Sequence, residues 1–515
     1  MSRRWKIFIV LALVLLGFIG IMMVTTHYQP QSEVEAYKQA LLAKGEKLEI
    51  AEVVPPSVPP EKNGADVVRA AFALLVSNGD DYTNLPAMMK MVAPGKAMIG
   101  WAQPDVRSYF TNTWENVMAA AAANRPATEL LRQAMDYPVI DFQLDYNAWP
   151  EVPVQHLASL KRCAQKLSAA AMCNLRAGDT ASATTNLCAL LALVQGTRDE
   201  RTLISQLVRL AMASIAASAD WELLQSANAT DAELAMLQRN WDRLEFVEAV
   251  GNSFLMERAG GEFALQEMRA SDADFNRFAG LPGPGGSGGG AGLRDWLDDL
   301  NDAWDNTKLA GAKFMWRASW SYSDELRALQ GCQIVLEALR TVQTNQCFNP
   351  AYTNMLNRFG AMGITNNPDE WLIKLDIPDF RRIFSGELEA FSAVVRKIMV
   401  AETAKRVVIT AIALKRYQLR HGNYPADLTA LVPGFVSRIP VDPVDGRPLR
   451  YRLNTDGTFT LYSVGINGKD DGGDPSSGKG SKPFYNWQNP DALDWVWPQP
   501  ATAEEVRNFY EHPPK

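Results

Sequence analysis

An uncharged apolar run near the amino terminus constrains this chain more than any other feature. The run starts at Ile7 and ends at Val24 and contains no charged residue. About 20 apolar residues in a helix cross a hydrocarbon core roughly 30 Å thick, so the run predicts a transmembrane helix. Arg3, Arg4 and Lys6 precede it. The positive-inside rule then places the amino terminus in the cytoplasm.

A cleaved signal peptide is the alternative for this segment. The apolar region of such a peptide has about 7–15 residues and ends at a cleavage site of small residues. Here the run is longer, and the residues that follow it, TTHYQP, contain no such site. The sequence therefore favours an uncleaved, single-pass signal anchor in the inner (cytoplasmic) membrane. Nearly all of the chain is then periplasmic or otherwise extracytoplasmic.

Composition narrows the remaining choices. The net charge of −7 argues against a nucleic-acid partner, because phosphate binding needs clustered Lys and Arg. The chain has five cysteines, an odd number, and none of them forms a CxxC pair. This usage argues against both a zinc site and a closed disulfide framework. A chain of 515 residues is too long for one core and predicts two or three domains.

The expected fold class is mainly α, with helical hairpins, an amino-terminal transmembrane helix and a carboxy-terminal α+β module. The predicted divisions are a cytoplasmic tip and anchor (1–27), a short helix and Pro-rich stalk (28–64), an α-helical hairpin domain (65–275), a Gly-rich linker (276–297), further helices packing on the helical domain (298–398), the module (399–498) and a tail (499–515).

Two of the expected helices meet at a tight turn. Gly178 suits the left-handed position that ends the first helix, and Asp179 suits the cap that begins the second. This pattern is similar to tetratricopeptide-type helical hairpins, although no repeat of fixed period is found. The glycine-rich residues 280–292 have no strand before them, so they read as a flexible linker and not as a phosphate-binding loop.

The last part of the chain changes from helical to alternating patterns. A helix is expected over residues 402–422, and turn signals follow at Asp445-Gly446 and in the sequence NTDG, residues 454–457. Apolar and polar residues alternate over 449–453 and again over 459–461. The pattern predicts an antiparallel hairpin that lays one face on the helix.

An acidic, glycine-rich loop, NGKDDGGD, follows this hairpin. It brings Asp470, Asp471 and Asp474 close together in sequence. Calcium takes about 6–8 oxygen ligands, and glycines allow backbone carbonyls to turn toward an ion. The loop lacks the alternate acidic spacing of an EF-hand. Its residues therefore leave two alternatives open, a calcium site and a solvated turn with a cluster of charges.

The order of motifs over about 399–498 resembles the globular domain of type II secretion major pseudopilins, the protein G family. The motifs are HGNYPADLTAL after a helix, IPVDPVDGRPLRYR before a strand, and FTLYSVGINGKDDGGD at the end of the next strand. The resemblance implies Ca²⁺ in the loop, with Asp470, Asp471 and Asp474 as ligands and Asp494 closing the site. It also suggests an envelope assembly of the type II secretion kind as a partner.

Two departures from the family pattern stand beside the resemblance. The pair Gly17-Phe18 lies inside the apolar run, and no glutamate stands at the fifth position after Gly17. The module is also separated from the apolar run by several hundred residues. We therefore expect a pseudopilin-like domain that serves another purpose than assembly into a pseudopilus.

No catalytic constellation is recognisable in the sequence. The four histidines are not at metal-ligand spacing, and HExxH and the Walker lysine loop are missing. The expected function is a membrane-anchored extracytoplasmic interaction or scaffold protein with a calcium-stabilised module. The alternatives are an enzyme without a recognisable motif and a glycan- or substrate-binding envelope module that uses Tyr485, Trp487, Trp495 and Trp497.

Overall fold

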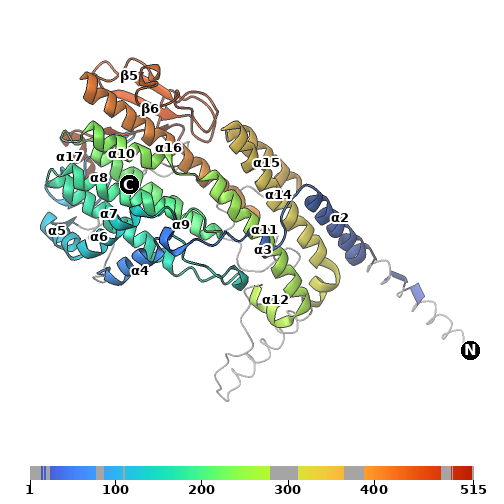
Figure 1. The fold of residues 1–515 in the computed structure, drawn as a ribbon. Coiled ribbons are helices and arrows are strands. Elements are labelled where there is room, and N and C mark those ends of the chain that lie inside the picture. Colours follow the sequence, from blue (N-terminus) through green and yellow to red (C-terminus); the bar gives the residue numbers. More distant parts are fainter. Residues whose placement is uncertain are drawn as a thin grey trace, which may run out of the picture.

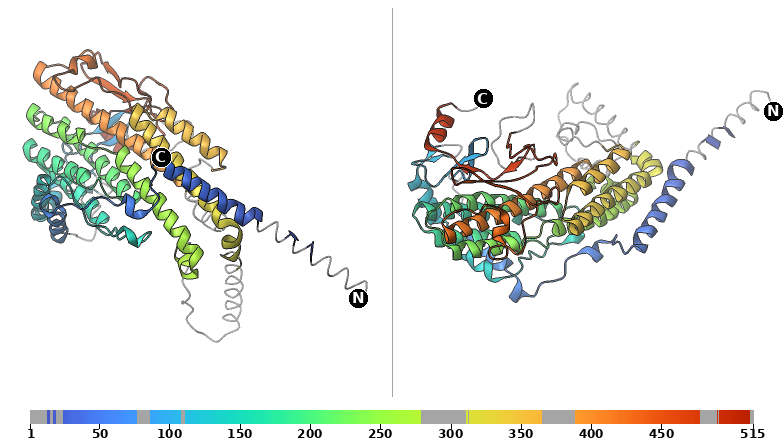
Figure 2. Two further views of the ribbon diagram at one scale, coloured as in Figure 1. Left: turned by 45° about the vertical axis from the view of Figure 1, so that its right-hand side comes forward. Right: turned by 90° about the horizontal axis from the view of Figure 1, so that it is seen from above.

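The structure is a computed structural model that describes residues 13–14, 17–18, 24–76, 86–107, 111–278, 311, 313–364, 388–476, 489 and 491–512. Helices make up most of it, which confirms the mainly α prediction. Most of the predicted transmembrane run and all of the glycine-rich residues 280–292 lie outside the described residues. Figures 1 and 2 show the long helices side by side, with α2 at one end of the body and the strands β5 and β6 at the other.

The body is built on long helices, with shorter helices at its edges. The long ones are α7 (His156–Arg176), α8 (Thr180–Gly196), α9 (Leu203–Leu224), α10 (Asp231–Asp242), α11 (Val247–Ala270), α14 (Ser321–Asn345), α15 (Asn349–Ala361) and α16 (Leu388–His421). The other helices are α2 (Gln29–Ala43), α3 (Ile50–Val53), α4 (Ala65–Leu74), α5 (Trp114–Ala123), α6 (Arg125–Gln133), α12 (Asp272–Phe278) and α17 (Ala503–Glu511). Single 3-10 or π turns are η1 (Val24–Tyr28), η2 (Pro60–Lys62), η3 (Ala134–Asp136), η4 (Tyr146–Ala148), η5 (Trp316–Trp320) and η7 (Leu428–Leu431).

The turn between α7 and α8 forms as the sequence predicts. Gly178 has φ +80°, a conformation that costs glycine little because it lacks a Cβ atom. The side chain of Asp179 accepts a hydrogen bond from the backbone N–H of Ser182 at 3.0 Å and caps α8. Local chemistry is therefore sufficient to set this helical hairpin.

The predicted hairpin is also present. Strands β5 (Arg450–Leu453) and β6 (Phe459–Ser463) pair antiparallel, and β7 (Trp495–Val496) adds a third strand beside β6. Smaller sheets that the sequence did not predict consist of β1 (Lys90–Ala93), β2 (Lys96–Met98) and β8 (Gln499–Pro500), and of β3 (Val106–Arg107) and β4 (Thr111–Asn112). Because β8 pairs with β2, the tail is attached to the first third of the chain.

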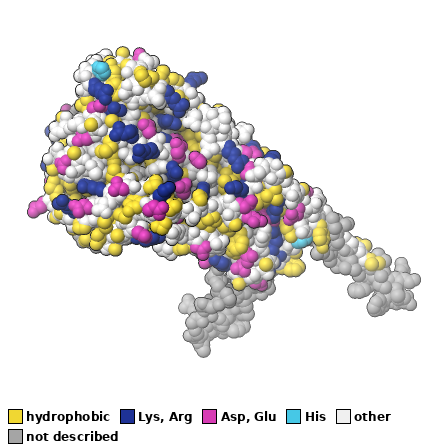
Figure 3. Space-filling view, in the orientation of Figure 1, with side chains coloured by type: hydrophobic (Ala, Val, Ile, Leu, Met, Phe, Trp, Pro, Cys, Tyr) yellow, Lys and Arg dark blue, Asp and Glu magenta, His cyan; other side chains and the backbone are white. Residues whose placement is uncertain are grey.

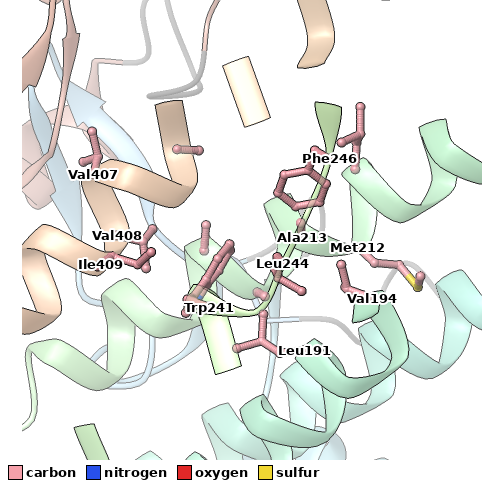
Figure 4. Packing of buried hydrophobic residues seen from close by; sticks show 14 of the residues in the cluster. Leu191, Val194, Met212, Ala213, Trp241, Leu244, Phe246, Val407, Val408 and Ile409 are labelled. Atoms are coloured by element: carbon pink, nitrogen blue, oxygen red, sulfur yellow. The ribbon is translucent and has the colours of Figure 1, made fainter. Parts of the chain in front are cut away.

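A continuous apolar core joins the helices to the carboxy-terminal sheet. It extends from Ala65 on α4 to Trp497 beyond β7. Figure 4 shows Trp241 of α10 between Val408 of α16 and Leu191 of α8. The domain boundary predicted at residue 399 lies inside α16, so the core continues across it.

Helix α9 is long and apolar enough to cross a membrane by length and composition, and it is the only such helix found among the described residues. In this fold 56% of its apolar window is buried inside the body. It also carries the buried charged residues Arg209, Asp220 and Glu222. These features are typical of the central helix of a folded core.

The segment predicted as a short helix and stalk packs on the body. Val34 and Leu41 of α2 are buried together with Leu48 and with Leu329 of α14. Ile50 and Val53 of α3 pack in a second cluster, which contains Met256 and Ala259 of α11. Residues 54–62, which contain the proline-rich stretch, run mostly exposed between α3 and α4. The hydrophobic clusters contain no described residue before Val34.

One helix–loop contact gives a test of this packing. A Cβ atom added at Gly260 of α11 would lie 2.4 Å from the Trp149 ring. We expect Gly260→Ala to lower the free energy of unfolding by about 1–3 kcal/mol, because the tightly packed ring must move. Gly251 lies on the same helix, where the nearest atom to an added Cβ is 4.0 Å away. Gly251→Ala is the control and should be neutral or stabilising by about 0.5–1 kcal/mol. Equal urea midpoints for the two variants would contradict the prediction.

Candidate functional site

The acidic loop after β6 is formed by residues in left-handed backbone conformations. Gly472 has φ +78° and Gly473 has φ +83°. Such values favour glycine, which explains why the loop is rich in this residue. The turn directs several backbone N–H groups, not carbonyl groups, toward one carboxylate.

That carboxylate belongs to Asp494, whose side chain is buried. It accepts hydrogen bonds from the backbone N–H groups of Gly473 at 2.8 Å and Asp474 at 3.1 Å, and more weakly from Asp471 at 3.5 Å. Burial raises the pKa of Asp494, and the amide donors act in the opposite direction. The resemblance implied Asp494 as a ligand that closes a calcium site at this loop, and here its carboxylate organises the loop backbone through amide donors.

Asp470 is held by neighbours within the module. Its Oδ1 atom accepts hydrogen bonds from the Tyr462 hydroxyl at 2.9 Å and from the Gly472 N–H at 3.1 Å. Its Oδ2 atom lies 3.5 Å from Nε of Arg450. The Tyr462 hydroxyl, followed by the Gly472 amide and Arg450, lowers the pKa of Asp470.

Arg450 contacts three carboxylates at once. Besides approaching Asp470, its guanidinium lies 2.6 Å from Asp445 and 3.3 Å from Asp442. A side chain of β5 therefore supplies the positive charge between the acidic groups at this edge of the module. Arg450 therefore offsets part of the negative charge of Asp442, Asp445 and Asp470.

The two remaining predicted ligands have separate partners. Asp471 accepts a hydrogen bond from the Asn467 side chain at 2.8 Å, and Asp474 accepts one from the Ser476 N–H at 2.9 Å. Within the described ranges, no group of three or more His, Cys, Asp or Glu residues is placed to hold a metal ion. The four carboxylates do not converge in this conformation, so they do not form a ready cation cradle. Calcium binding stays a prediction.

Asp442, in the turn before β5, is a structural residue of the module. It is fully buried and accepts hydrogen bonds from the Val444 N–H at 2.9 Å, the Val464 N–H at 3.0 Å and the Ser463 hydroxyl at 2.8 Å. It therefore joins the turn before β5 to the end of β6. The local motif, VDPVDG, indicated the turn, but nothing in it pointed to the contacts with β6.

An open cleft of about 890 Å³ lies in the described part of the chain. We call it the α11–α16 cleft. It lies between the start of α11, the last turns of α14, the middle of α16 and the loop 436–443. Its lining includes Asp242, Glu245, Glu248, Leu336, Leu339, Arg340, Gln343, Gln346, Phe348, Glu402, Lys405, Arg406, Ile409 and Arg438. This volume falls in the range of about 300–1,000 Å³ that is common for ligand sites.

Two buried charged residues of α16 fix one wall of the cleft. Lys405 donates a hydrogen bond to the carbonyl of Leu244, and Glu402 accepts one from the N–H of Phe246 at 3.2 Å. Both side chains hold the connection between α10 and α11 in place. Their hydrogen bonds to the backbone satisfy groups that would be costly to bury alone.

Four exposed charged residues of the cleft are open to a partner. Asp242, Glu245 and Glu248 form an acidic edge, and Arg438 extends from the opposite loop. None of these four forms an ion pair with another described residue. Figure 3 shows acidic and basic side chains interspersed over the middle of one face of the body, without a large field of one sign. The cleft thus offers both charges above an apolar floor.

The aromatic residues proposed for glycan binding have a different role where they are described. Trp495 is 2% exposed and Trp497 is 3% exposed, so both rings belong to the core. Tyr485 and Trp487 lie outside the described residues. The two described rings present no flat exposed face, so they give the glycan alternative no support.

Comparisons with known proteins add no family. The chain matches no family model, no curated protein and no solved structure.

Proposed function

We propose that this chain is a membrane-anchored extracytoplasmic interaction or scaffold protein, and that the α11–α16 cleft receives a segment of a partner protein. The observation that carries the proposal is the attachment of α2 to the body. This helix follows closely after the predicted transmembrane run. Buried ion pairs hold it, so an anchor continuous with α2 would present the cleft at the membrane in one orientation.

The attachment consists of two groups of charges. Lys38 of α2 pairs with Glu262 of α11 and with Glu325 of α14. Glu46, just after α2, pairs with Arg258 at 2.9 Å and with Arg340. The side chains of Glu325 and Arg258 are fully buried. Buried pairs are costly to break because separation leaves an uncompensated charge, so α2 and the body should move together.

The cleft supports partner binding more than chemistry on a small substrate. Its acidic edge and Arg438 lack ion-pair partners among the described residues, and its floor includes Leu336, Leu339 and Ile409. A polypeptide segment with complementary charges beside an apolar side chain would satisfy all three features. Complementary charges at the rim chiefly set which partner binds and how fast it associates.

Crosslinking in native membranes tests the proposal. A photoreactive amino acid is placed at Gln343, an exposed residue of α14 that lines the cleft. The control is Thr341, an exposed residue of the same helix that does not line it. We expect a specific protein adduct at Gln343 that is lost in the double variant Glu245→Lys and Glu248→Lys. Equal adducts at both positions, or none, would contradict the proposal.

The carboxy-terminal module forms a further part of the proposal. We infer that it is pseudopilin-like, with Asp470, Asp471, Asp474 and Asp494 as the residues that would hold Ca²⁺. An ion there would add a positive charge to a loop that now relies on Arg450 and backbone amides. The motifs quoted from the sequence support this inference.

Calcium should then raise the melting temperature of the full chain. Binding to the folded state alone stabilises by about 2.7 kcal/mol when the ion is at a hundred times its dissociation constant. The measurement compares melts with calcium, with magnesium and with a chelator. Asp474→Asn is the matched variant and should lose the shift. An unchanged melt would remove calcium from the proposal and leave the anchored interaction protein intact.

A further inference from the structure

A second, smaller cavity lies between α9 and α16. It has a volume of about 350 Å³, and we call it the α9–α16 groove. Its lining consists of Leu207, Leu210, Ala211, Ala213, Ser214, Trp241, Arg396, Lys397, Val400, Ala401 and Ala404. The volume lies at the lower end of the range for small-molecule sites, about 300–1,000 Å³.

The groove is apolar along its length because small residues alternate with aliphatic ones. Ala211, Ala401 and Ala404 leave space, while Leu207 and Val400 provide apolar walls. Trp241 is 1% exposed and forms part of the base. Along α16 the lining residues extend from Arg396 to Ala404, which corresponds to about 12 Å of helix.

Positive charge is concentrated at one end of this groove. Arg396 and Lys397 are the only charged residues in its lining, and both lie at its start on α16. Arg396 is 3.7 Å from Asp491, a loose ion pair. Lys397 is exposed and forms no ion pair with any described residue. The groove thus combines a long apolar surface with net positive charge at one end.

We propose that the α9–α16 groove binds one acyl chain with an anionic headgroup. The chain lies along Leu207 and Val400 toward Ala404, and a carboxylate or phosphate contacts Arg396 and Lys397. A partner helix fits less well, because stable protein interfaces bury at least about 1,200 Å² in total and the groove is short. The proposal stands independently of the proposed function, since it uses neither the α11–α16 cleft nor the acidic loop.

The test uses the full chain held soluble in an amphipathic polymer and a fluorescent fatty acid, 11-(dansylamino)undecanoic acid, as the probe. We expect saturable binding of one probe per chain and displacement by laurate. Dodecanol and dodecyltrimethylammonium have the same chain length without the negative charge and should displace it at least about tenfold less well. Displacement by laurate is then compared with displacement by lauroyl-lysophosphatidylglycerol. The better competitor shows whether the groove takes a free fatty acid or the acyl chain of a lipid.

Two variants test the charged end and the apolar part of the groove separately. The double variant Arg396→Gln and Lys397→Gln should weaken the binding of laurate about tenfold, because two exposed ion pairs with the carboxylate are lost. The binding of dodecanol should stay unchanged. Ala401→Trp fills the groove and should abolish saturable binding. If that variant does not fold, Val400→Glu places a like charge beside the carboxylate and should have the same effect on laurate.

Three outcomes would overturn the proposal. The first is that the wild-type chain shows no saturable binding, which would leave the groove to a partner helix. The second is that neutral and anionic chains compete equally, so that Arg396 and Lys397 play no part. The third is that binding survives in folded Ala401→Trp, which would place the probe elsewhere.

Discussion

Replacing Glu46 by alanine is expected to lower the free energy of unfolding by about 3–5 kcal/mol, because the substitution leaves a buried cation without its partner. Arg258, whose side chain is fully buried, donates to Glu46 at 2.9 Å, and Arg340 pairs with the same carboxylate. Gln333 donates a further hydrogen bond to it at 3.0 Å. Urea denaturation of the full chain measures the effect. The control is Glu35→Ala on α2, where the side chain is exposed and the change should stay within about 0.5 kcal/mol.

The same carboxylate gives a pH dependence with a defined sign. The Arg340 guanidinium, with Gln333 and Arg258, holds the pKa of Glu46 at about 2, against an ordinary value of 4.5. Its contribution to stability is fully present above pH 4.5 and is lost as the pH falls toward 2. The stabilities of the wild type and of Glu46→Ala should therefore converge at low pH. A gap that stays constant from pH 7 to the acid limit would show that the charge of Glu46 is unimportant.

The second large effect is expected at Glu222, where stability should change with pH in the opposite direction to that at Glu46. This residue of α9 is fully buried, and its carboxyl accepts hydrogen bonds from the N–H groups of Met89 at 2.8 Å and Gly100 at 3.0 Å. Burial raises the pKa of Glu222 to about 8 from an ordinary value of 4.5. Between these values the unfolded chain releases a proton that the folded chain keeps. Stability should fall as the pH rises, by at most about 1.4 kcal/mol per pH unit.

Glu222→Gln tests this prediction because glutamine keeps one acceptor and cannot ionise. We expect the variant to lose less stability than the wild type between pH 5 and pH 8, and to be the more stable protein at pH 8. Burial likewise raises the pKa of Asp220 to about 8, so a residual slope should remain until Asp220→Asn is added. Parallel pH profiles for the wild type and Glu222→Gln would mean that Glu222 is already ionised in the folded protein.

Much of the secondary structure could be predicted from the sequence because its signals are local. The turn between α7 and α8 needs only Gly178 and the cap at Asp179. The hairpin of β5 and β6 needs only alternation and a turn at Gly457, which has φ +83°. Residues within one or two turns of each other decide such features, so no knowledge of the rest of the chain is required.

The candidate site could be predicted less well. The acidic residues Asp470, Asp471 and Asp474 lie in the loop after β6, and backbone N–H groups of this loop donate to Asp494. Their partners were missed, because Arg450 enters from β5 and the amide donors depend on the backbone path of the loop. A cluster of aspartates is compatible with an ion, an arginine or a set of amides. The spacing of the aspartates in the sequence does not show which of these three kinds of partner they have.

The sequence by itself determined the apolar run near the amino terminus, the mainly helical character, and the hairpin with its acidic loop. Only the tertiary structure decided that α2 is bound to the body, that the core crosses residue 399, and that α11 and α16 enclose a cleft. The physical reason is the separation of the partners along the chain. Glu46 and Arg340 are 294 residues apart, and such a pair forms only after the intervening helices have packed.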